Sequence, residues 1–187
     1  MCANMQIIGI DLAGSEKNDT GFCVLVGDGA SKRVKTEVLK TDKDILLQCA
    51  LLKPDIIAID APLTPARNAF MRPADEELKE YGTLPQSLRG MTYLVQRGIE
   101  LGNKLKKDYK VIEVFNTATA KILGFHEKKD IEMQKRLARM VDGDLKDRIL
   151  SRDELDSISS AFTGFLHLQG KTTEIGDDEG RIVIPKV

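Results

Sequence analysis

Two uninterrupted hydrophobic runs, each followed at once by an aspartate, are the strongest pattern along the chain. Residues 7–10 (IIGI) lead into Asp11, and residues 56–59 (IIAI) lead into Asp60. Runs of this length without a polar position are typical of strands that are buried on both faces of a sheet. A carboxylate at the end of such a strand is costly to bury, so these two acids need a physical explanation.

The pattern after the first run predicts two more strands and a helix. Residues 20–30 (TGFCVLVGDGA) are rich in β-forming residues and end in a turn signal, and apolar residues alternate with polar ones over residues 32–40. With the first run, these segments predict a three-stranded antiparallel meander. Residues 42–53 carry apolar residues at helical spacing and stop before Pro54, which predicts a helix.

The middle of the chain predicts an irregular, loop-rich insert at about residues 61–90. This stretch holds four of the six prolines, together with glycines and charged residues, and one short helix is expected near residues 75–81. Residues 91–107 follow as an amphipathic helix. Residues 109–115 (YKVIEVF) are expected to form a strand whose interior carries Glu113.

The last third of the chain predicts helices and one closing strand. A helical segment is expected at about residues 117–150. The final helix begins after Ser151, because Ser151 and Glu154 have the spacing of a capping box. Residues 179–187 close the chain as a short strand, and Pro185 places this strand at a sheet edge.

Composition restricts the class of protein. The chain of 187 residues fits one domain over residues 1–187, and its 42% hydrophobic and 30% charged residues are typical of a globular protein. A formal net charge of -1 argues against a broad basic face. Any contact with nucleic acid is therefore expected to be local.

The cysteines and the hydropathy predict the cellular location. Cys2, Cys23 and Cys49 are odd in number and widely spaced, so neither a disulfide framework nor a zinc site is expected, and a reducing cytoplasm is the predicted location. No apolar run approaches the length of a membrane span, so no membrane association is expected.

Five acids are candidates for one catalytic site. Asp11, Asp60 and Glu113 lie at strand positions, and Asp153 and Asp156 lie three residues apart in the final helix. Carboxylates that converge repel one another unless a proton or a cation neutralises them. Oxygen ligands without Cys or His favour Mg²⁺ or Mn²⁺ over zinc. Asp11, Asp60, Glu113 and Asp156 are therefore predicted metal ligands, and Asp153 is a predicted auxiliary acid.

Each acid also has a structural alternative. Asp11 and Asp60 are followed by turn residues, and an aspartate stabilises many turns without any catalytic role. Glu113 fits an edge strand on which it faces water. Asp153 lies in the first turn of a helix, where the macrodipole favours an acid. The residues alone leave both interpretations open.

Four arginines in or just after the insert are candidates for binding a substrate. The planar guanidinium group matches phosphate oxygens well, so these side chains are predicted to contact a nucleic-acid backbone. The alternative is that they pair with nearby acids on a solvated face. The four are Arg67, Arg72, Arg89 and Arg97.

The order of the predicted elements resembles the ribonuclease H fold. Three strands in a meander are followed by a helix, a fourth strand, an insert, a fifth strand and a final acidic helix. The resemblance implies an α/β fold with a mixed five-stranded sheet, in which parallel strands follow the antiparallel meander, flanked by helices. In that superfamily, acids on the first strand, the fourth strand and the last helix bind the catalytic metals, and by position these are Asp11, Asp60 and Asp156.

Five segments are more closely similar to an uncharacterised prokaryotic domain-of-unknown-function family, whose members are predicted nucleases with a ribonuclease H-like fold. The family pattern has a proline where this chain has Asn116 and an alanine where it has Ser157, and neither difference removes a carboxylate. The spacing of Asp153 and Asp156 is also similar to the final-helix acids of Holliday-junction resolvases. The five segments are GIDLAGSEKNDTGF, IAIDAPL, SLRGMTYLVQRGIEL, VIEVFNTATAKILG and DELDSISSAFTGFL.

The leading hypothesis is a hydrolase, namely a metal-dependent nuclease that cleaves phosphodiester bonds at a two-metal carboxylate site. One alternative is nucleotide binding, because the segment DLAGSEKNDTG is similar to the first phosphate-binding turn of sugar kinases and actin-like ATPases. Another is a non-catalytic binding module on the same scaffold. The expected partner is a nucleic acid or a nucleotide, and a homodimer is among the assembly states that the resemblance to resolvases implies.

Overall fold

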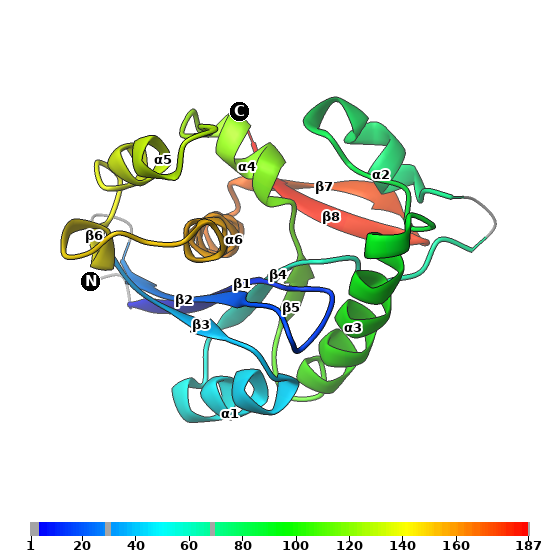
Figure 1. The fold of residues 1–187 in the computed structure, drawn as a ribbon, viewed down its shortest axis with the longest axis horizontal. Coiled ribbons are helices and arrows are strands. Elements are labelled where there is room, and N and C mark those ends of the chain that lie inside the picture. Colours follow the sequence, from blue (N-terminus) through cyan, green and yellow to red (C-terminus); the bar gives the residue numbers. More distant parts are fainter. Residues whose placement is uncertain (1–3, 29–30, 68–69, 187) are drawn as a thin grey trace.

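A mixed sheet of six strands lies at the centre of this computed structural model, which describes residues 4–28, 31–67 and 70–186 (Figure 1). β1 (Met5–Asp11), β2 (Thr20–Gly27) and β3 (Lys32–Leu39) form the predicted antiparallel meander. β4 (Ile56–Asp60) pairs parallel to β1, and β5 (Val111–Glu113) pairs parallel to β4. With the short β6 (Asp142–Gly143) at one edge, the strand order β5-β4-β1-β2-β3-β6 confirms the predicted mixed sheet.

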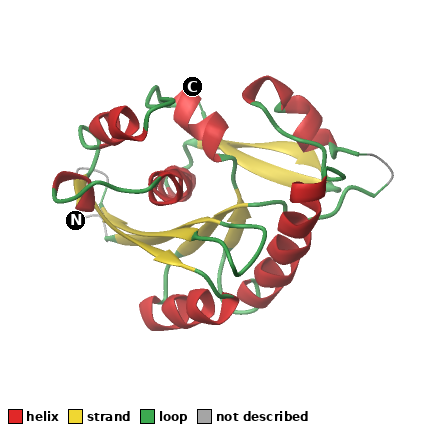
Figure 2. Cartoon of the chain, viewed as in Figure 1, coloured by secondary structure: helices red, strands yellow, loops and turns green. Residues whose placement is uncertain are grey.

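Different helices cover the two faces of the sheet, as Figure 2 also shows. α6 (Arg152–Leu168) lies on one face, whereas α1 (Asp42–Leu52) and α3 (Arg89–Leu105) lie on the other. Successive side chains of a strand point to opposite faces, so Ile7 packs on the α6 side and Ile8 on the other side. Because both faces of β1 and β4 are buried, these strands need their unbroken hydrophobic runs.

Glycine allows the first half of α6 to lie directly against the strands. A Cβ atom at Gly9 would be 2.2 Å from the carbonyl oxygen of Ser157 and 2.3 Å from the backbone nitrogen of Ala161. A Cβ atom at Gly21 would be 1.9 Å from the carbonyl oxygen of Asp153. Since these contacts are to backbone atoms, a larger residue at either glycine would push α6 away from the sheet.

The structure confirms the predicted helices that flank the sheet. The predicted capping box is present at the start of α6, where the Ser151 hydroxyl accepts from the backbone N–H of Glu154 at 3.2 Å. In the insert, α2 (Pro73–Glu77) is followed by a 3₁₀ turn over Lys79–Tyr81, close to the predicted short helix. No helix in the described ranges is long and apolar enough to cross a bilayer.

The predicted helical segment at about residues 117–150 is only partly helical. α4 (Asn116–Ile122) and α5 (Asp130–Leu137) are short, and the chain then forms β6 (Asp142–Gly143), a two-residue strand that pairs with β3. Gly143 has a φ angle of 117°, which other residues rarely adopt. This turn ends the helical segment and adds a sixth strand that the sequence did not predict.

A hairpin closes the chain as a separate two-stranded sheet. β8 (Gly180–Pro185) is the predicted closing strand, and it pairs antiparallel to β7 (Thr172–Asp177). β7 was not predicted, because its sequence TTEIGD has only one hydrophobic residue. The hairpin packs against α2 of the insert through Ile182 and Ala74, so the two segments form one small core beside the main sheet.

Candidate active site

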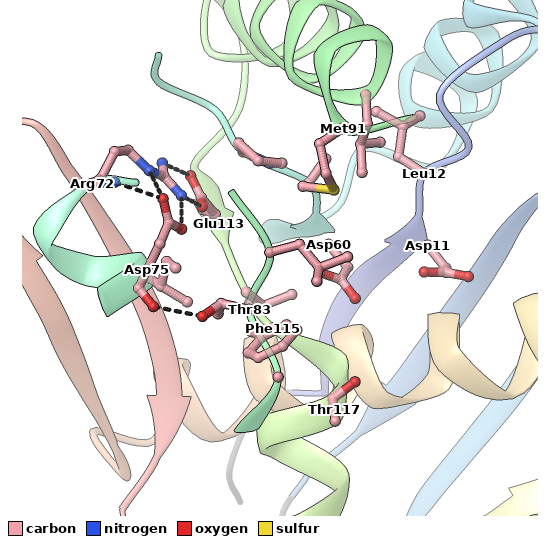
Figure 3. A pocket seen from close by; sticks show the side chains of 17 residues that line it. Asp11, Leu12, Asp60, Arg72, Asp75, Thr83, Met91, Glu113, Phe115 and Thr117 are labelled. Carbon is pink, nitrogen blue, oxygen red and sulfur yellow. Dashed lines mark hydrogen bonds and ion pairs between the residues drawn. The ribbon is translucent and has the colours of Figure 1, made fainter. Parts of the chain in front are cut away.

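Asp11 and Asp60 lie side by side at the same edge of the sheet. They are direct partners in the parallel pairing of β1 with β4, and each ends its strand. Four residues earlier, the partners Ile7 and Ile56 both belong to the core on the α6 side. By alternation, Asp11 and Asp60 point to this same face, and Figure 3 shows the two carboxylates next to each other.

α6 brings two more acids to this edge. Asp156 lies in the part of α6 that Gly9 and Gly21 hold against the strands, and its charge acts on both Asp11 and Asp60. Asp153 lies almost one helical turn earlier, and its charge also acts on Asp11. The structure therefore brings together four of the five predicted acids: Asp11, Asp60, Asp153 and Asp156.

Burial and mutual repulsion raise the pKa of both strand acids. The pKa of Asp11 lies well above its usual value, mainly through burial and then through the charges of Asp60, Asp156 and Asp153. Burial also raises the pKa of Asp60 to about 7, against the lowering effect of a hydrogen bond from the backbone of Asn116. Both strand acids therefore bind protons more tightly than an exposed aspartate does.

The two helix acids have raised pKa values for a similar reason. Burial raises the pKa of Asp156 to about 6, although the charge of Arg152 opposes the change. The pKa of Asp153 is raised by burial first and then by the charge of Asp19. Both helix acids therefore also bind protons more tightly than an exposed aspartate does.

Asn116 connects the two strand acids, and its role was not predicted from the sequence. Its backbone N–H donates to Oδ2 of Asp60 at 3.2 Å, and its side-chain amide donates to Oδ1 of Asp11 at 3.3 Å. The hydroxyl of Ser160 donates to the amide oxygen of Asn116 at 2.7 Å, which orients the amide. A proline, which the family pattern has at this position, carries neither a backbone N–H nor a side-chain amide and could donate neither hydrogen bond. The replacement of this proline by Asn116 was therefore the sequence feature that could have indicated its role.

Glu113 lies on the other face of the sheet from the four acids, although it lines the first hollow and its charge also raises the pKa of Asp60. It pairs in register with Ile59, whose side chain lies in the core on the α1 and α3 side, so Glu113 points to the face of the sheet opposite Asp60. There both of its oxygens accept from Arg72, at 2.5 and 2.9 Å, and one also accepts from the backbone N–H of Leu63 at 2.8 Å. The structure therefore places this predicted metal ligand in a buried ion pair.

Arg72 is used inside the protein, contrary to its predicted role in binding a substrate backbone. Its side chain is 0% exposed, and besides Glu113 it donates to both carboxylate oxygens of Asp75 at 2.8 and 3.0 Å. A buried arginine needs such partners, because an unpaired charge in the interior is very costly. This ion-pair network attaches the insert to β5 beside the acid cluster (Figure 3).

Arg97 is also an internal residue. Its guanidinium pairs with Asp42 at 2.8 Å and donates to the carbonyl oxygens of Ala13 and Lys40, each at 2.7 Å. These bonds fasten the loop that follows β1 to the start of α1. Among the four predicted substrate-binding arginines, Arg67 and Arg89 are exposed and make no ion pair within the described ranges.

Two hollows meet at Asp11. The first has a volume of about 310 Å³ and lies between the strand acids and the insert (Figure 3). The second has a volume of about 620 Å³ and is bordered by the loop after β1, with Lys17, Lys40 and Asp153 in its lining. The acid cluster is thus accessible from two sides.

The acid cluster has the donor atoms that a divalent cation needs. Asp11, Asp60 and Asp156 offer only oxygen atoms, and within the described residues none of them forms an ion pair with a lysine or arginine. In the described part of the chain, no three acidic, histidine or cysteine side chains already stand in an arrangement that could hold a metal ion. The donor chemistry fits Mg²⁺ or Mn²⁺, and these side chains have to close around an ion to hold it.

Comparison with known proteins supports the fold rather than a family. RuvC from Thermus thermophilus has a similar structure, with a TM-score of 0.56 and 16% sequence identity over 89% of this chain and 97% of the RuvC chain. No protein-family model matches the chain, and no curated protein matches its sequence. The similarity to the uncharacterised nuclease family therefore rests on the quoted segments alone. The mixed sheet, its helices and the match to RuvC together show that the chain has a ribonuclease H-like fold.

Proposed function

We propose that the protein is a divalent-metal-dependent nuclease that hydrolyses phosphodiester bonds. The observation that carries the proposal is that Asp11, Asp60 and Asp156 lie at one accessible edge of the sheet, where none of them forms an ion pair with a described lysine or arginine. Carboxylates arranged in this way are unfavourable in a purely structural role, because each raises the free energy of its neighbours' charged forms. A cation that a substrate phosphate can also contact removes this cost.

Asp11, Asp60 and Asp156 are the proposed ligands for Mg²⁺ or Mn²⁺. Such an ion, when bound, would supply a polarised water for attack and stabilisation of the charge that develops on the phosphate oxygens. Asp153 remains the proposed auxiliary acid, since it lies at the second hollow next to Asp11. We leave Glu113 out of the ligand set, because both of its oxygens are engaged by Arg72.

The neighbouring groups of this chain prepare the acids for that role. The amide of Asn116 holds Asp11 in one orientation, and its backbone N–H holds Asp60. Oδ2 of Asp11 and Oδ1 of Asp60 accept no hydrogen bond from the described residues, and both are therefore available to an ion. The spacing of Asp153 and Asp156, which is similar to that of the final-helix acids of Holliday-junction resolvases, and the structural similarity to RuvC support a nucleic acid as the substrate.

Calorimetric titration with Mn²⁺ tests the metal site directly. We expect the wild type to bind Mn²⁺ and the Asp11→Asn and Asp156→Asn variants to bind at least tenfold more weakly, as expected when a charged ligand is lost. Asp108→Asn is the matched control, because Asp108 is exposed and lies after α3, away from the cluster. Equal binding by wild type and both variants would contradict the shared metal site.

Cleavage assays then test the reaction. Single-stranded, duplex and branched DNA and RNA are incubated with Mg²⁺ or Mn²⁺ and analysed for new ends. We expect cleavage of at least one substrate by the wild type and by Asp108→Asn, and none by Asp11→Asn. Metal binding without any cleavage would favour the non-catalytic binding module.

A further inference from the structure

The hollow between the acids and the insert has hydrocarbon walls, which a metal site does not require. In Figure 3, Met91 and Leu12 lie above Asp60 and Phe115 lies below it, with Asp11 to the right. Leu84 also lines it and is 53% exposed. Apolar side chains on two opposing sides of an accessible pocket are typical of a site for a flat, apolar group.

The size of the pocket limits what can enter. Its volume of about 310 Å³ lies at the lower end of the range of about 300 to 1,000 Å³ for small-molecule sites. A single base with its sugar fits this range, whereas a stacked base pair of a duplex is much too large. A base that enters must therefore be unpaired or turned out of its stack.

Polar groups on the pocket wall can contact the edge of a base. The Thr117 hydroxyl makes no hydrogen bond with the described part of the chain and can donate or accept. The Thr83 hydroxyl donates to the carbonyl oxygen of Asp75 at 2.5 Å, so it still has lone pairs to accept with. The pocket thus combines stacking surface with a few hydrogen-bonding groups.

We propose that this pocket binds the base of an unpaired nucleotide whose phosphate lies at Asp11 and Asp60. The proposed position of the phosphate depends on the proposed nuclease function, whereas the proposed binding of the base is inferred from the residues that line the pocket. The second hollow lies on the other side of Asp11 and leaves room for the continuing strand; its lining includes Lys17, and Lys40, which pairs with Asp19 at 3.3 Å. The substrate class is therefore a nucleic acid with an unpaired nucleotide at the site of cleavage.

The test uses a duplex with one unpaired 2-aminopurine, whose fluorescence changes when its surroundings change. The linkage beside this base is a neutral methylphosphonate, so that binding requires no metal to offset repulsion by the carboxylates. Two comparison duplexes have the same sequence, one fully paired and one with an abasic site in place of the unpaired base. Binding is followed by fluorescence and by anisotropy with the full-length protein.

Variants of the pocket wall locate the binding. We expect Phe115→Ala to bind the unpaired base about five- to 100-fold more weakly, which is the range for loss of base stacking on an aromatic ring. We expect Leu84→Ala to bind about threefold or more weakly, and its exposure means that the fold should tolerate the change. Leu51→Ala is the matched control, since Leu51 is a 68% exposed leucine on α1.

The outcomes separate the base pocket from the nuclease proposal. Preference for the unpaired base over both comparison duplexes, weakened about threefold or more in Leu84→Ala and unchanged in Leu51→Ala, supports the pocket even if no cleavage is found. Equal binding of the abasic duplex, or wild-type binding by Leu84→Ala, overturns it even if the protein is a nuclease. If a nucleoside monophosphate displaced the duplex at the same concentration, the ligand would be a free nucleotide. The proposal that the pocket binds a nucleotide within a nucleic-acid strand would then be overturned.

Discussion

Asp11 and Asp60 are direct register partners on two parallel strands, and both side chains point toward α6. Because the hydrogen bonds of β1 with β4 set the register, both side chains start from neighbouring positions on the same face of the sheet. Repulsion between them is therefore built into the sheet. This arrangement leads to the following expected outcomes.

The stability of the metal-free protein should fall as the pH rises from about 4 to 7. In this range the folded state still holds protons on Asp60, whose pKa is about 7, and on Asp156, whose pKa is about 6, whereas the unfolded chain has lost them. The unfolded state then binds fewer protons, so each group lowers the free energy of unfolding by up to about 1.4 kcal/mol per pH unit. Denaturant unfolding in EDTA at several pH values measures this slope.

Asp60→Asn provides the control for this pH dependence, since it removes one titrating group and should flatten the slope of stability against pH.

Mn²⁺ should raise the melting temperature more at pH 8 than at pH 5, because at pH 8 the carboxylates are charged and can bind the ion. Stability that stays constant or rises between pH 4 and 7 in EDTA would contradict the raised pKa values.

Gly9→Ala should destabilise the protein by about 3 kcal/mol or more, because the added carbon would lie within 2.3 Å of backbone atoms of α6. Gly90→Ala in α3 is the matched control, as nothing lies within 4 Å of its added Cβ atom, and it should be neutral or stabilising by up to about 1 kcal/mol. Chemical denaturation compares the two. Similar effects of both substitutions would mean that α6 does not depend on close contact with β1.

Arg72→Met should destabilise the protein by about 3 to 5 kcal/mol, since it leaves Glu113 and Asp75 buried without their partner. Arg136→Met is the control, because Arg136 pairs with Glu127 in a half-exposed ion pair that contributes at most about 1 kcal/mol. Denaturant midpoints of the two variants give the comparison. If Arg72→Met weakened binding of nucleic acid while leaving stability unchanged, the original prediction of a substrate contact would be correct after all.

Arg67→Ala and Arg89→Ala should weaken binding of nucleic acid without loss of stability. Both side chains are exposed and lack an ion-pair partner in the described structure, so each substitution should lower the slope of log affinity against log salt by about 1 if the arginine contacts a phosphate. Arg139→Ala, which changes an exposed arginine after α5, serves as the control. Unchanged salt slopes for Arg67→Ala and Arg89→Ala would remove these two residues from the substrate-binding surface.

Hydrophobic pattern predicted the main elements because each of them depends on local sequence. The unbroken runs before Asp11 and Asp60 identified the two buried strands, and the capping box at Ser151 identified the start of the last helix. β6 and β7 were missed for the opposite reason. A two-residue strand and a half-buried hairpin strand have too few hydrophobic residues to produce a period, and their pairing partners determine their structure.

The sequence by itself determined that acids end the two buried strands and that the last helix carries two more. Only the tertiary structure decided which acids meet. Glu113 differs from Asp60 by one step of strand alternation, and this step turns its side chain to the opposite face, where Arg72 neutralises it. Register between strands depends on long-range hydrogen bonds and packing, which local sequence does not encode, so the membership of the site became clear only when the strands were paired.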